Sequence, residues 1–297
     1  MKVLVIAGNG MLGHKLCQIL SRRMEVWATV TKETINYSEY NLVQKDHLIG
    51  QINIQDIVSL QKVIEGVKPQ VVVNAVGIVK QRDEAKQAVP SIQVNALFPH
   101  QLADICEKYG IRVLQISTDC VFSGEKGNYS EIDKADPMDL YGRSKLLGEL
   151  NRSGCLTLRT SIIGWELSRF TSLLSWFASQ RGRSIKGYKN AIYSGFSTSV
   201  LAKLISDLIE TRPDLQGLYH VASKPISKYD LLFQMRNELG WDDIDIEPDE
   251  LFCCDRSLDG SRFTAITGWH SPCWNQMISE LASEWETYSD YYQTRKL

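Results

Sequence analysis

Short apolar runs alternate in the first half of the chain with segments whose apolar residues recur at helical spacing. The run at 2–7 is rich in β-branched residues, as expected of a strand buried on both faces. The segment 11–23 follows with an amphipathic helical pattern. The same reasoning predicts strands at 25–30, 70–75, 111–117 and 155–159, and helices at 55–66 and 92–109. Strands that alternate with helices in this way predict a parallel sheet covered on both faces.

After residue 154 the alternation loosens. Helices are predicted at 170–180, 199–211, 227–239 and 274–285, a strand at 217–221, and a Gly-rich irregular stretch at 182–193. We therefore expect a larger domain at 1–160, which the segment 195–222 rejoins. The remaining residues of 161–297 would form a smaller lobe interleaved with it.

Composition narrows the class of protein. The 297 residues are 43% hydrophobic and 23% charged, with a net charge of −2, as in ordinary globular proteins. No basic stripe supports a nucleic-acid partner, and no run is apolar and long enough to cross a membrane. The seven scattered cysteines lack zinc-site spacing, and the N-terminus lacks a signal-peptide pattern. We expect a reduced cytoplasmic protein.

A glycine-rich loop follows the first predicted strand. Its residues, Gly8, Asn9, Gly10, Met11, Leu12 and Gly13, satisfy G-x-G-x-x-G and open the first helix. Such glycines permit a tight turn and close backbone approach to a pyrophosphate, and the helix N-terminus offers N–H donors to it. The loop predicts a Rossmann-type doubly wound sheet that binds a dinucleotide.

The end of the second strand bears on which nicotinamide cofactor binds. NAD sites usually place an acidic residue there, to bond the ribose 2′-hydroxyl. Here Thr31 and Lys32 stand at that end, and a hydroxyl with an ammonium suits a 2′-phosphate better. Glu33 is the competing candidate, as an acidic residue that would suit NAD, although it falls beyond the predicted strand. NADP is therefore favoured, with NAD as the alternative.

Three side chains suggest carbonyl reduction. Thr118 closes a predicted strand, and Tyr141 and Lys145 lie one helical turn apart, on one face of a predicted helix. Reducing a ketone requires a proton donor, and a phenol is a poor acid at neutral pH. We expect the ammonium to lower the pKa of Tyr141, and the Thr118 hydroxyl to hold the carbonyl oxygen.

This order of motifs resembles the extended short-chain dehydrogenase/reductases. Across much of the chain it is similar to the dTDP-4-dehydrorhamnose reductase family. The stretches that carry the resemblance are 9–13 (Asn-Gly-Met-Leu-Gly), 94–96 (Val-Asn-Ala), 117–124 (Ser-Thr-Asp-Cys-Val-Phe-Ser-Gly), 141–149 and 158–161 (Leu-Arg-Thr-Ser). The resemblance implies that NADPH reduces the C4 keto group of a nucleotide-linked 4-keto-6-deoxysugar. Tyr141 would be the proton donor, Lys145 would also bind the nicotinamide ribose, and Thr118 would bind the substrate oxygen.

The resemblance also implies further cofactor contacts. The loop of Asn74, Ala75, Val76 and Gly77 stands where the family has Asn-Ala-Ala-Gly along the cofactor. Asn53 and Ile54 stand where such proteins usually carry Asp-Ile beside the adenine, so Asn53 departs from the pattern. Ala7 stands where the family's first glycine is expected.

One departure from related enzymes favours reduction. Sugar-nucleotide 4,6-dehydratases resemble this chain but follow the strand-end Thr with an Asp-Glu pair, which serves the elimination of water. Here Asp119 and Cys120 follow, and a thiol is a poor replacement for Glu. We expect Asp119 to bond the local backbone. Two alternatives stay open: a non-catalytic NADP-binding regulatory subunit and a nucleotide-sugar epimerase.

The second half would supply the nucleotide-sugar site. Arg256 lies in a stretch that resembles a loop near the family's substrate, and its planar fork suits a diphosphate. A surface salt bridge explains Arg256 equally well. Lys80 and Gln81 follow the Asn74 loop and are expected to face the cleft. Four aromatic residues could stack on a base or sugar, although core packing is the more common role of each: Trp165, Trp176, Tyr193 and Phe196. We predict no metal; the oligomeric state stays open, with a homodimer as one alternative.

Overall fold

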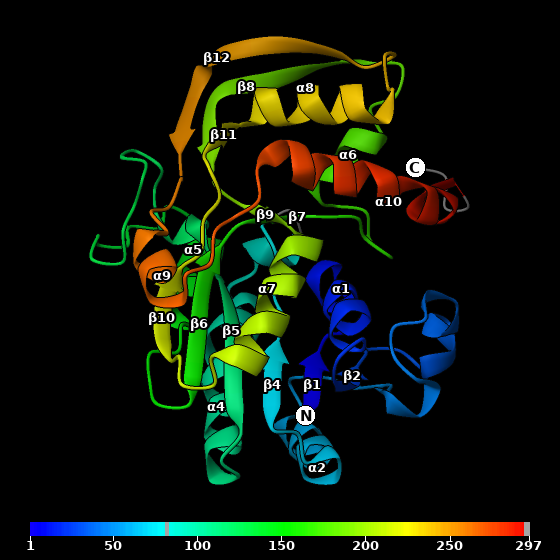
Figure 1. Cartoon of the computed structure of the whole chain (residues 1–297), viewed down its shortest axis with the longest axis vertical. Coiled ribbons are helices and arrows are strands. Elements are labelled where there is room, and N and C mark those ends of the chain that lie inside the picture. The colour runs from blue at the N-terminus through cyan, green and yellow to red at the C-terminus, as the bar shows by residue number, and fades with distance from the viewer. Residues whose placement is uncertain (81–82, 294–297) are drawn as a thin grey trace.

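The chain folds into a seven-stranded parallel sheet with a smaller region beyond its carboxyl ends (Figure 1). The structure is a computed structural model and describes residues 1–80 and 83–293. The strands of the sheet are β1 (Lys2–Ile6), β2 (Glu25–Thr29), β3 (Leu48–Ile49), β4 (Val71–Asn74), β5 (Arg112–Thr118), β6 (Cys155–Thr160) and β10 (Gly217–His220). The helices of this region are α1 (Met11–Leu20), α2 (Ile57–Val67), α3 (Ala88–Ser91), α4 (Phe98–Lys108), α5 (Leu140–Leu147) and α7 (Thr198–Thr211).

The strand order places a crevice at the middle of the sheet. The order is β10-β6-β5-β4-β1-β2-β3, and every neighbouring pair is parallel. The chain runs from β1 outward to β3 and then crosses back to β4 on the other side of β1. Ligands of such sheets bind where the order reverses, outside the carboxyl ends of the strands. The predicted doubly wound Rossmann-type fold is thus confirmed.

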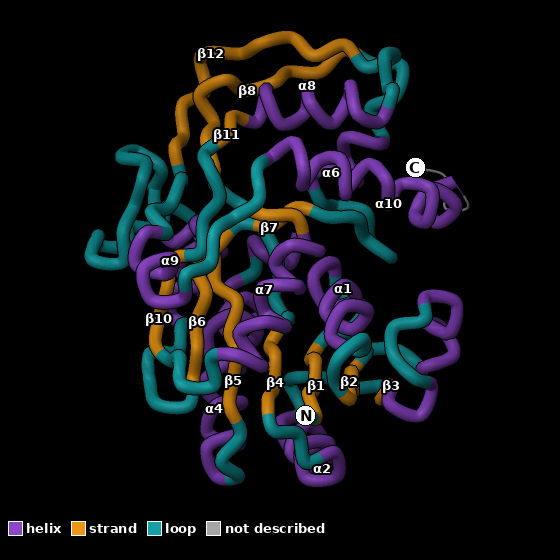
Figure 2. The backbone as a smooth tube through the Cα atoms, in the orientation of Figure 1, coloured by secondary structure: helices purple, strands orange, loops and turns teal. Residues whose placement is uncertain are grey.

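Alternate residues of the central strand enter two separate cores. Val3 and Val5 belong to a core that includes apolar residues of α1 and α7. Leu4 and Ile6 belong to a second core, with apolar residues of α2 and α4. A strand covered by helices on both faces must be apolar at every position, which explains the continuous run at 2–7. Figure 2 shows the helices around the strands of this sheet.

The smaller region contains a second sheet. Its strands are β8 (Ser184–Tyr193), β11 (Ile226–Ser227) and β12 (Asp245–Asp255), in the order β11-β8-β12. Two short strands, β7 (Ile162–Ile163) and β9 (Phe196–Ser197), form a parallel pair, and the helices are α6 (Leu173–Ala178), α8 (Lys228–Leu239), α9 (Ser261–Thr267) and α10 (Trp274–Gln293). In Figure 1 the second sheet and α8 lie at the opposite end of the molecule from α2 and α4. The proposed division into domains at residue 160 stays a prediction.

The prediction of an irregular stretch at 182–193 was wrong, because residues 184–193 form β8. Ile185 and Tyr193 point inward, while Lys186 and Lys189 are exposed, so the strand is half-buried. Gly187 is a packing residue rather than a strand breaker. A Cβ there would lie 2.7 Å from a ring carbon of Tyr229, and glycine in a strand often marks such close approach.

Candidate active site

The glycine-rich loop connects β1 to α1 in a tight turn. Ala7 adopts a φ of 64°, and the Gly10 amide donates to the Ala7 carbonyl oxygen at 3.0 Å. A Cβ on Gly13 would lie 2.0 Å from that same oxygen, so only glycine lets the helix pack against the loop. Ala7 therefore holds a left-handed conformation that glycine would adopt at lower cost. The departure noted at this position leaves the turn intact.

Two adjoining compartments open beside this loop, of about 210 and 250 Å³. Both are lined by Asn9, Thr31, Ser168 and Arg169. The predicted cofactor residues fall into two groups, those that line a compartment and those that do not. Those that line a compartment are Asn9, Gly10, Met11, Thr31, Lys32, Ile54, Ala75, Val76 and Gly77. The loop thus borders a cleft that is also lined by the end of β2 and by the loop after β4.

The other predicted cofactor residues support the cleft instead of lining it. Leu12 is buried in the core, and Gly8 packs against Ala28. The Asn53 side-chain oxygen accepts from the Gln55 amide at 3.0 Å, which stabilises the approach to α2. Asn74 is buried, and its side-chain oxygen accepts from the Val76 amide at 3.1 Å. Its amide nitrogen donates to Gln115 on β5 at 2.7 Å, so the loop after β4 is fixed to the sheet.

A buried asparagine connects this loop to α5. Asn95 lies in a π-helical segment (Ile92–Leu97) between α3 and α4, where one continuous helix was predicted. Its oxygen accepts from the Ile78 amide at 2.9 Å, and its nitrogen donates to the Ile78 carbonyl and to the Ser144 hydroxyl. Single π-turns are frequent at functional sites, because they reorient a side chain within a helix. Here the π-segment directs Asn95 between the cleft and the helix that carries Tyr141.

The C-terminal helix supports the loop from the other side. His14 is fully buried on α1, and burial lowers its pKa to about 3, so the ring is neutral. Its Nδ1 donates to the Gly10 carbonyl at 2.8 Å, which leaves Nε2 to accept from the Tyr288 hydroxyl of α10 at 2.6 Å. Lys15 pairs with Glu284 of the same helix at 2.9 Å. The first helix and the last are therefore joined beside the cleft.

Thr118, Asp119 and Cys120 end β5 at the edge of the crevice. The Thr118 hydroxyl donates to the Asp119 carboxylate at 3.0 Å and accepts from the Cys120 amide at 3.1 Å. Both Thr118 and Asp119 are 6% exposed. Burial raises the pKa of Asp119, and the bond from Thr118, Lys228 and Arg256 oppose that shift. The expectation that Asp119 bonds the local backbone is not met, since its partner is a side chain that faces the site.

Tyr141 and Lys145 lie in the first and second turns of α5, which Asp139 caps by accepting from the Gly142 amide at 2.8 Å. The Lys145 ammonium is buried and donates to the Ile116 carbonyl at 2.7 Å. Burial lowers its pKa to about 8, and Glu149 opposes that shift. The pKa of Tyr141 is raised by burial and next by Cys120, whereas hydrogen bonding to Thr118 lowers it. We expected Lys145 to lower the pKa of this phenol, but the net shift is upward, because burial outweighs the groups that lower it.

The predicted substrate residues gather around the same strand end. Arg256, which follows β12, donates to the carbonyls of Phe122 and Ser123 at 2.9 and 3.2 Å. Lys80 pairs with Asp139 at 2.7 Å. Both Lys80 and Arg256 act electrostatically on Cys120. Gln81 lies outside the described residues.

The aromatic candidates have different surroundings. Trp165 is fully buried and donates to the Leu281 carbonyl, and Phe196 is also buried in the core. Trp176 is 39% exposed on α6. Tyr193 lies next to Lys228, whose ammonium is 3.4 Å from the ring centroid. Lys228, Ser168 and Arg169 belong to no short motif, so the sequence offered no signal for them.

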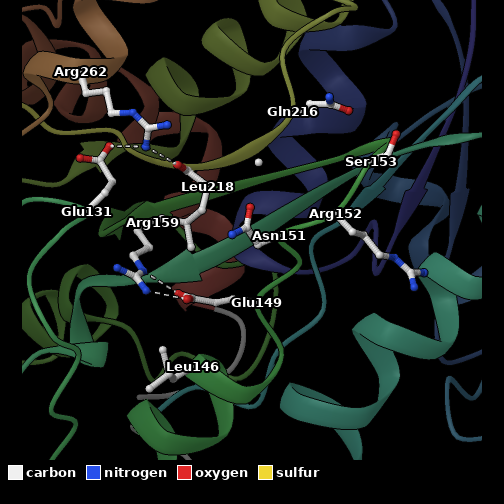
Figure 3. Close-up of a pocket in the computed structure, with 11 residues that line it drawn as sticks. Glu131, Leu146, Glu149, Asn151, Arg152, Ser153, Arg159, Gln216, Leu218 and Arg262 are labelled. Atoms are coloured by element: carbon white, nitrogen blue, oxygen red, sulfur yellow. Dashed lines mark hydrogen bonds and ion pairs between the residues drawn. The ribbon is translucent and has the colours of Figure 1, made fainter.

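Another cavity, of about 730 Å³, lies away from the cleft, beside β6 and β10 (Figure 3). Four of its charged residues are paired with one another: Arg159 makes a two-bond contact with Glu149, at 2.7 Å each, and Arg262 approaches Glu131. Both partners of the Arg159–Glu149 pair are 8% exposed. Glu149 also accepts from the Ser117 hydroxyl at 2.6 Å. This pair fixes the end of α5 to the sheet behind Thr118.

Metal sites and membrane-spanning helices are two further features to consider in the described part of the chain. Across residues 1–80 and 83–293, no three His, Cys, Asp or Glu side chains are grouped as a metal site requires. Within the same residues, no helix is both long and apolar enough to span a bilayer.

The fold and the site define an extended short-chain dehydrogenase/reductase. Residues 1–281 match the RmlD substrate binding domain family, to which the chain therefore belongs. The chain is 27% identical over 252 residues to a dTDP-4-dehydrorhamnose reductase of Aggregatibacter actinomycetemcomitans, with 80% of this chain and 79% of that protein covered.

Solved structures show the same fold. A hypothetical dTDP-4-dehydrorhamnose reductase from Sulfolobus tokodaii superposes with a TM-score of 0.76 at 27% identity, covering 93% of this chain and 98% of that one. The dTDP-4-dehydrorhamnose reductase of Bacillus anthracis, in complex with NADP, gives a TM-score of 0.78 at 19% identity, covering 95% and 99%.

Proposed function

We propose that the protein reduces the C4 keto group of a nucleotide-activated 4-keto-6-deoxysugar with NADPH, and that Tyr141 donates the proton. The observation that carries this proposal is that Thr118, at the end of β5, acts on the pKa of Tyr141, while buried Lys145 lies one turn further along the same helix. Family membership and the similarity to a dTDP-4-dehydrorhamnose reductase support the same reaction.

The residues of the cleft fit a dinucleotide. Gly13 leaves no room for a side chain between helix and loop, and within the described residues no side chain caps the N-terminus of α1. The first turn of α1 also has no acidic residue, so its positive end can face a pyrophosphate. Thr31, Lys32 and Arg169 would hold the adenosine ribose and its 2′-phosphate. When bound, NADPH supplies the hydride for the carbonyl carbon.

The raised pKa of Tyr141 suits reduction. A phenol whose pKa lies above its ordinary value is protonated throughout the neutral range, so the proton is present when the carbonyl oxygen gains negative charge. The alkoxide that forms is a much stronger base than a phenolate, and the transfer from Tyr141 is therefore favourable. The Thr118 hydroxyl would orient the oxygen toward this donor.

Lys145 would stabilise the phenolate that remains after proton transfer. Its ammonium is held by the Ile116 carbonyl in a buried position, where a charge acts more strongly than in water. With a pKa of about 8, the side chain is mostly charged at neutral pH. Lys145 thus supports the donor without losing its own proton.

Turnover of defined substrates tests the proposal. The purified protein is mixed with NADPH and either dTDP- or UDP-4-keto-6-deoxyglucose, and the loss of NADPH absorbance is followed. We expect turnover with one of them, and a decrease in kcat of about 10²- to 10⁴-fold in Tyr141→Phe, with NADPH affinity unchanged. Tyr219→Phe, which changes a buried tyrosine on β10, is the matched control and should keep wild-type kcat.

The same measurements separate the alternatives. Cofactor that stays bound through purification, with epimerised product and no net oxidation, would indicate an epimerase. Absence of turnover with both substrates, with a stoichiometric partner protein recovered and Tyr141→Phe without phenotype, would indicate a regulatory subunit. Either result would refute the reductase proposal.

A further inference from the structure

Tyr193 has a buried hydroxyl without a hydrogen-bond partner in the described part of the chain. The residue ends β8 and is 3% exposed. Buried hydroxyls nearly always have a partner, because an unpaired one has lost its water without compensation. Burial raises the pKa of Tyr193, with a contribution from Asp119, so the hydroxyl is protonated and lies within electrostatic reach of the end of β5.

Lys228 is the second unusual group at this place. It is the first residue of α8, where the helix dipole disfavours a cation. Its ammonium lies over the Tyr193 ring, 3.4 Å from the centroid, and no hydrogen bond or ion pair to it occurs among residues 1–80 and 83–293. Burial lowers its pKa to about 8, while Asp119, Cys120 and Cys254 oppose that shift.

Both groups face the candidate catalytic residues. Asp119 and Cys120 act on Lys228, and the same two residues act on Tyr141. Thr118 and Tyr141 belong to the region of the larger sheet. Lys228 and Tyr193 therefore face them from the smaller region. Two hydrogen-bond donors, Tyr193 and Lys228, thus lie close to each other and within electrostatic reach of the Asp119 carboxylate.

The hydrogen-bonding groups of Tyr193, Lys228 and Asp119 indicate which kind of ligand they can bind. A sugar hydroxyl both accepts and donates, so it can accept from Tyr193 or Lys228 and donate to Asp119. A diphosphate is less suitable, because the Asp119 carboxylate would repel it. The position beside Tyr141 is where the carbons next to the reacting carbonyl must lie.

We propose that Tyr193, Lys228 and Asp119 bind a hydroxyl of the hexose next to the reacting carbonyl, and thereby select sugars that retain it. This inference rests on the proposed reductase function. The unpaired donors of the protein are satisfied when such a sugar binds, and a sugar that lacks the hydroxyl leaves them unpaired in the complex.

Paired substrates and paired variants test the site. The substrates are dTDP-4-keto-6-deoxyglucose and its analogue without the C3 hydroxyl. Tyr193→Phe and Lys228→Met should each lower kcat/KM for the hydroxylated sugar by about 10- to 100-fold, as expected for a hydrogen bond to a charged or buried group. On the deoxy analogue, both variants should match the wild type, which itself should be slow. Equal losses on the two sugars, or no loss on either, would overturn the proposal.

Controls distinguish a binding role from a structural one. Tyr219→Phe and Lys224→Met change a buried tyrosine on β10 and an exposed lysine that precedes α8, and should leave both substrates unaffected. Tyr193→Phe removes only an unpaired hydroxyl, so its melting temperature should equal or exceed that of the wild type. A clear decrease in melting temperature would assign the hydroxyl a structural role and contradict the proposal.

Calorimetric binding of the same two sugars without NADPH separates this proposal from the reductase proposal. If the wild type binds the hydroxylated sugar but does not reduce it, the reductase proposal fails. The site proposal is then supported only if Tyr193→Phe and Lys228→Met raise Kd for that sugar alone. Failure of the wild type to bind either sugar would overturn both proposals.

Discussion

Replacing Lys145 by Met should make the fold more stable at neutral pH while abolishing most activity. The side chain is 6% exposed, and burial lowers its pKa from 10.5 to about 8. Such a shift corresponds to about 3 kcal/mol of destabilisation of the folded state, at about 1.4 kcal/mol per pKa unit. The variant also loses the hydrogen bond to the Ile116 carbonyl, and this loss offsets about 1 kcal/mol of the stabilisation. The net gain in unfolding free energy is therefore about 2 kcal/mol.

The gain should depend on pH with a definite sign. Below pH 8 the lysine is charged in both states, so the full penalty of burying the ammonium is present. Between pH 8 and 10.5 the unfolded state binds the proton and the folded state does not, so the wild type becomes more stable as pH rises. The advantage of Lys145→Met should accordingly shrink across this window and vanish above it.

Urea unfolding at pH 7 and pH 10 measures both effects. Lys134→Met, which changes an exposed lysine, is the matched control and should differ little from the wild type at either pH. A variant that is less stable than the wild type at pH 7 would refute the reasoning. A difference that stays constant between the two pH values would do so as well.

Three further outcomes are expected. The reductive kcat should fall as pH rises through about 8, where Lys145 loses its charge, and this decrease should be absent in Lys145→Met when pH–rate profiles are compared. Glu149→Gln should destabilise the fold by about 3–5 kcal/mol in urea unfolding, because it leaves the buried Arg159 guanidinium unpaired, and adding Arg159→Met should restore most of that loss. Lys32→Ala and Arg169→Ala should each raise the Kd for NADPH, measured by fluorescence, without changing that for NADH; parallel losses for both cofactors would contradict the assignment.

Features determined by neighbouring residues could be predicted from the sequence. The run at 2–7 is apolar at every position because both faces of β1 are covered, and periodicity detects this directly. The glycine-rich loop is equally local, since Gly13 is required by a backbone atom only six residues away. Family resemblance then assigned Thr118, Tyr141 and Lys145 to one site, and this assignment stays a prediction.

Features that depend on distant contacts could not be predicted. Gly187 resembles a strand breaker until Tyr229, from α8, packs over it. Lys228 and Tyr193 are far apart in the chain. They become neighbours, near the end of β5, only when β8 and α8 pack together in the folded protein. The pKa of Tyr141 depends first on burial in the folded chain, which the helical spacing of Tyr141 and Lys145 does not reveal.

The bond between His14 and Tyr288 has a consequence for biosynthesis. The two residues are 274 positions apart, so the support of the glycine-rich loop is synthesised long after the loop itself. Domains generally fold from the N-terminus during synthesis, so the loop can form its turn before α10 is available to hold His14. Nascent chains and products cut before Tyr288 would thus present an incompletely supported nucleotide loop, which couples cofactor retention to the presence of α10.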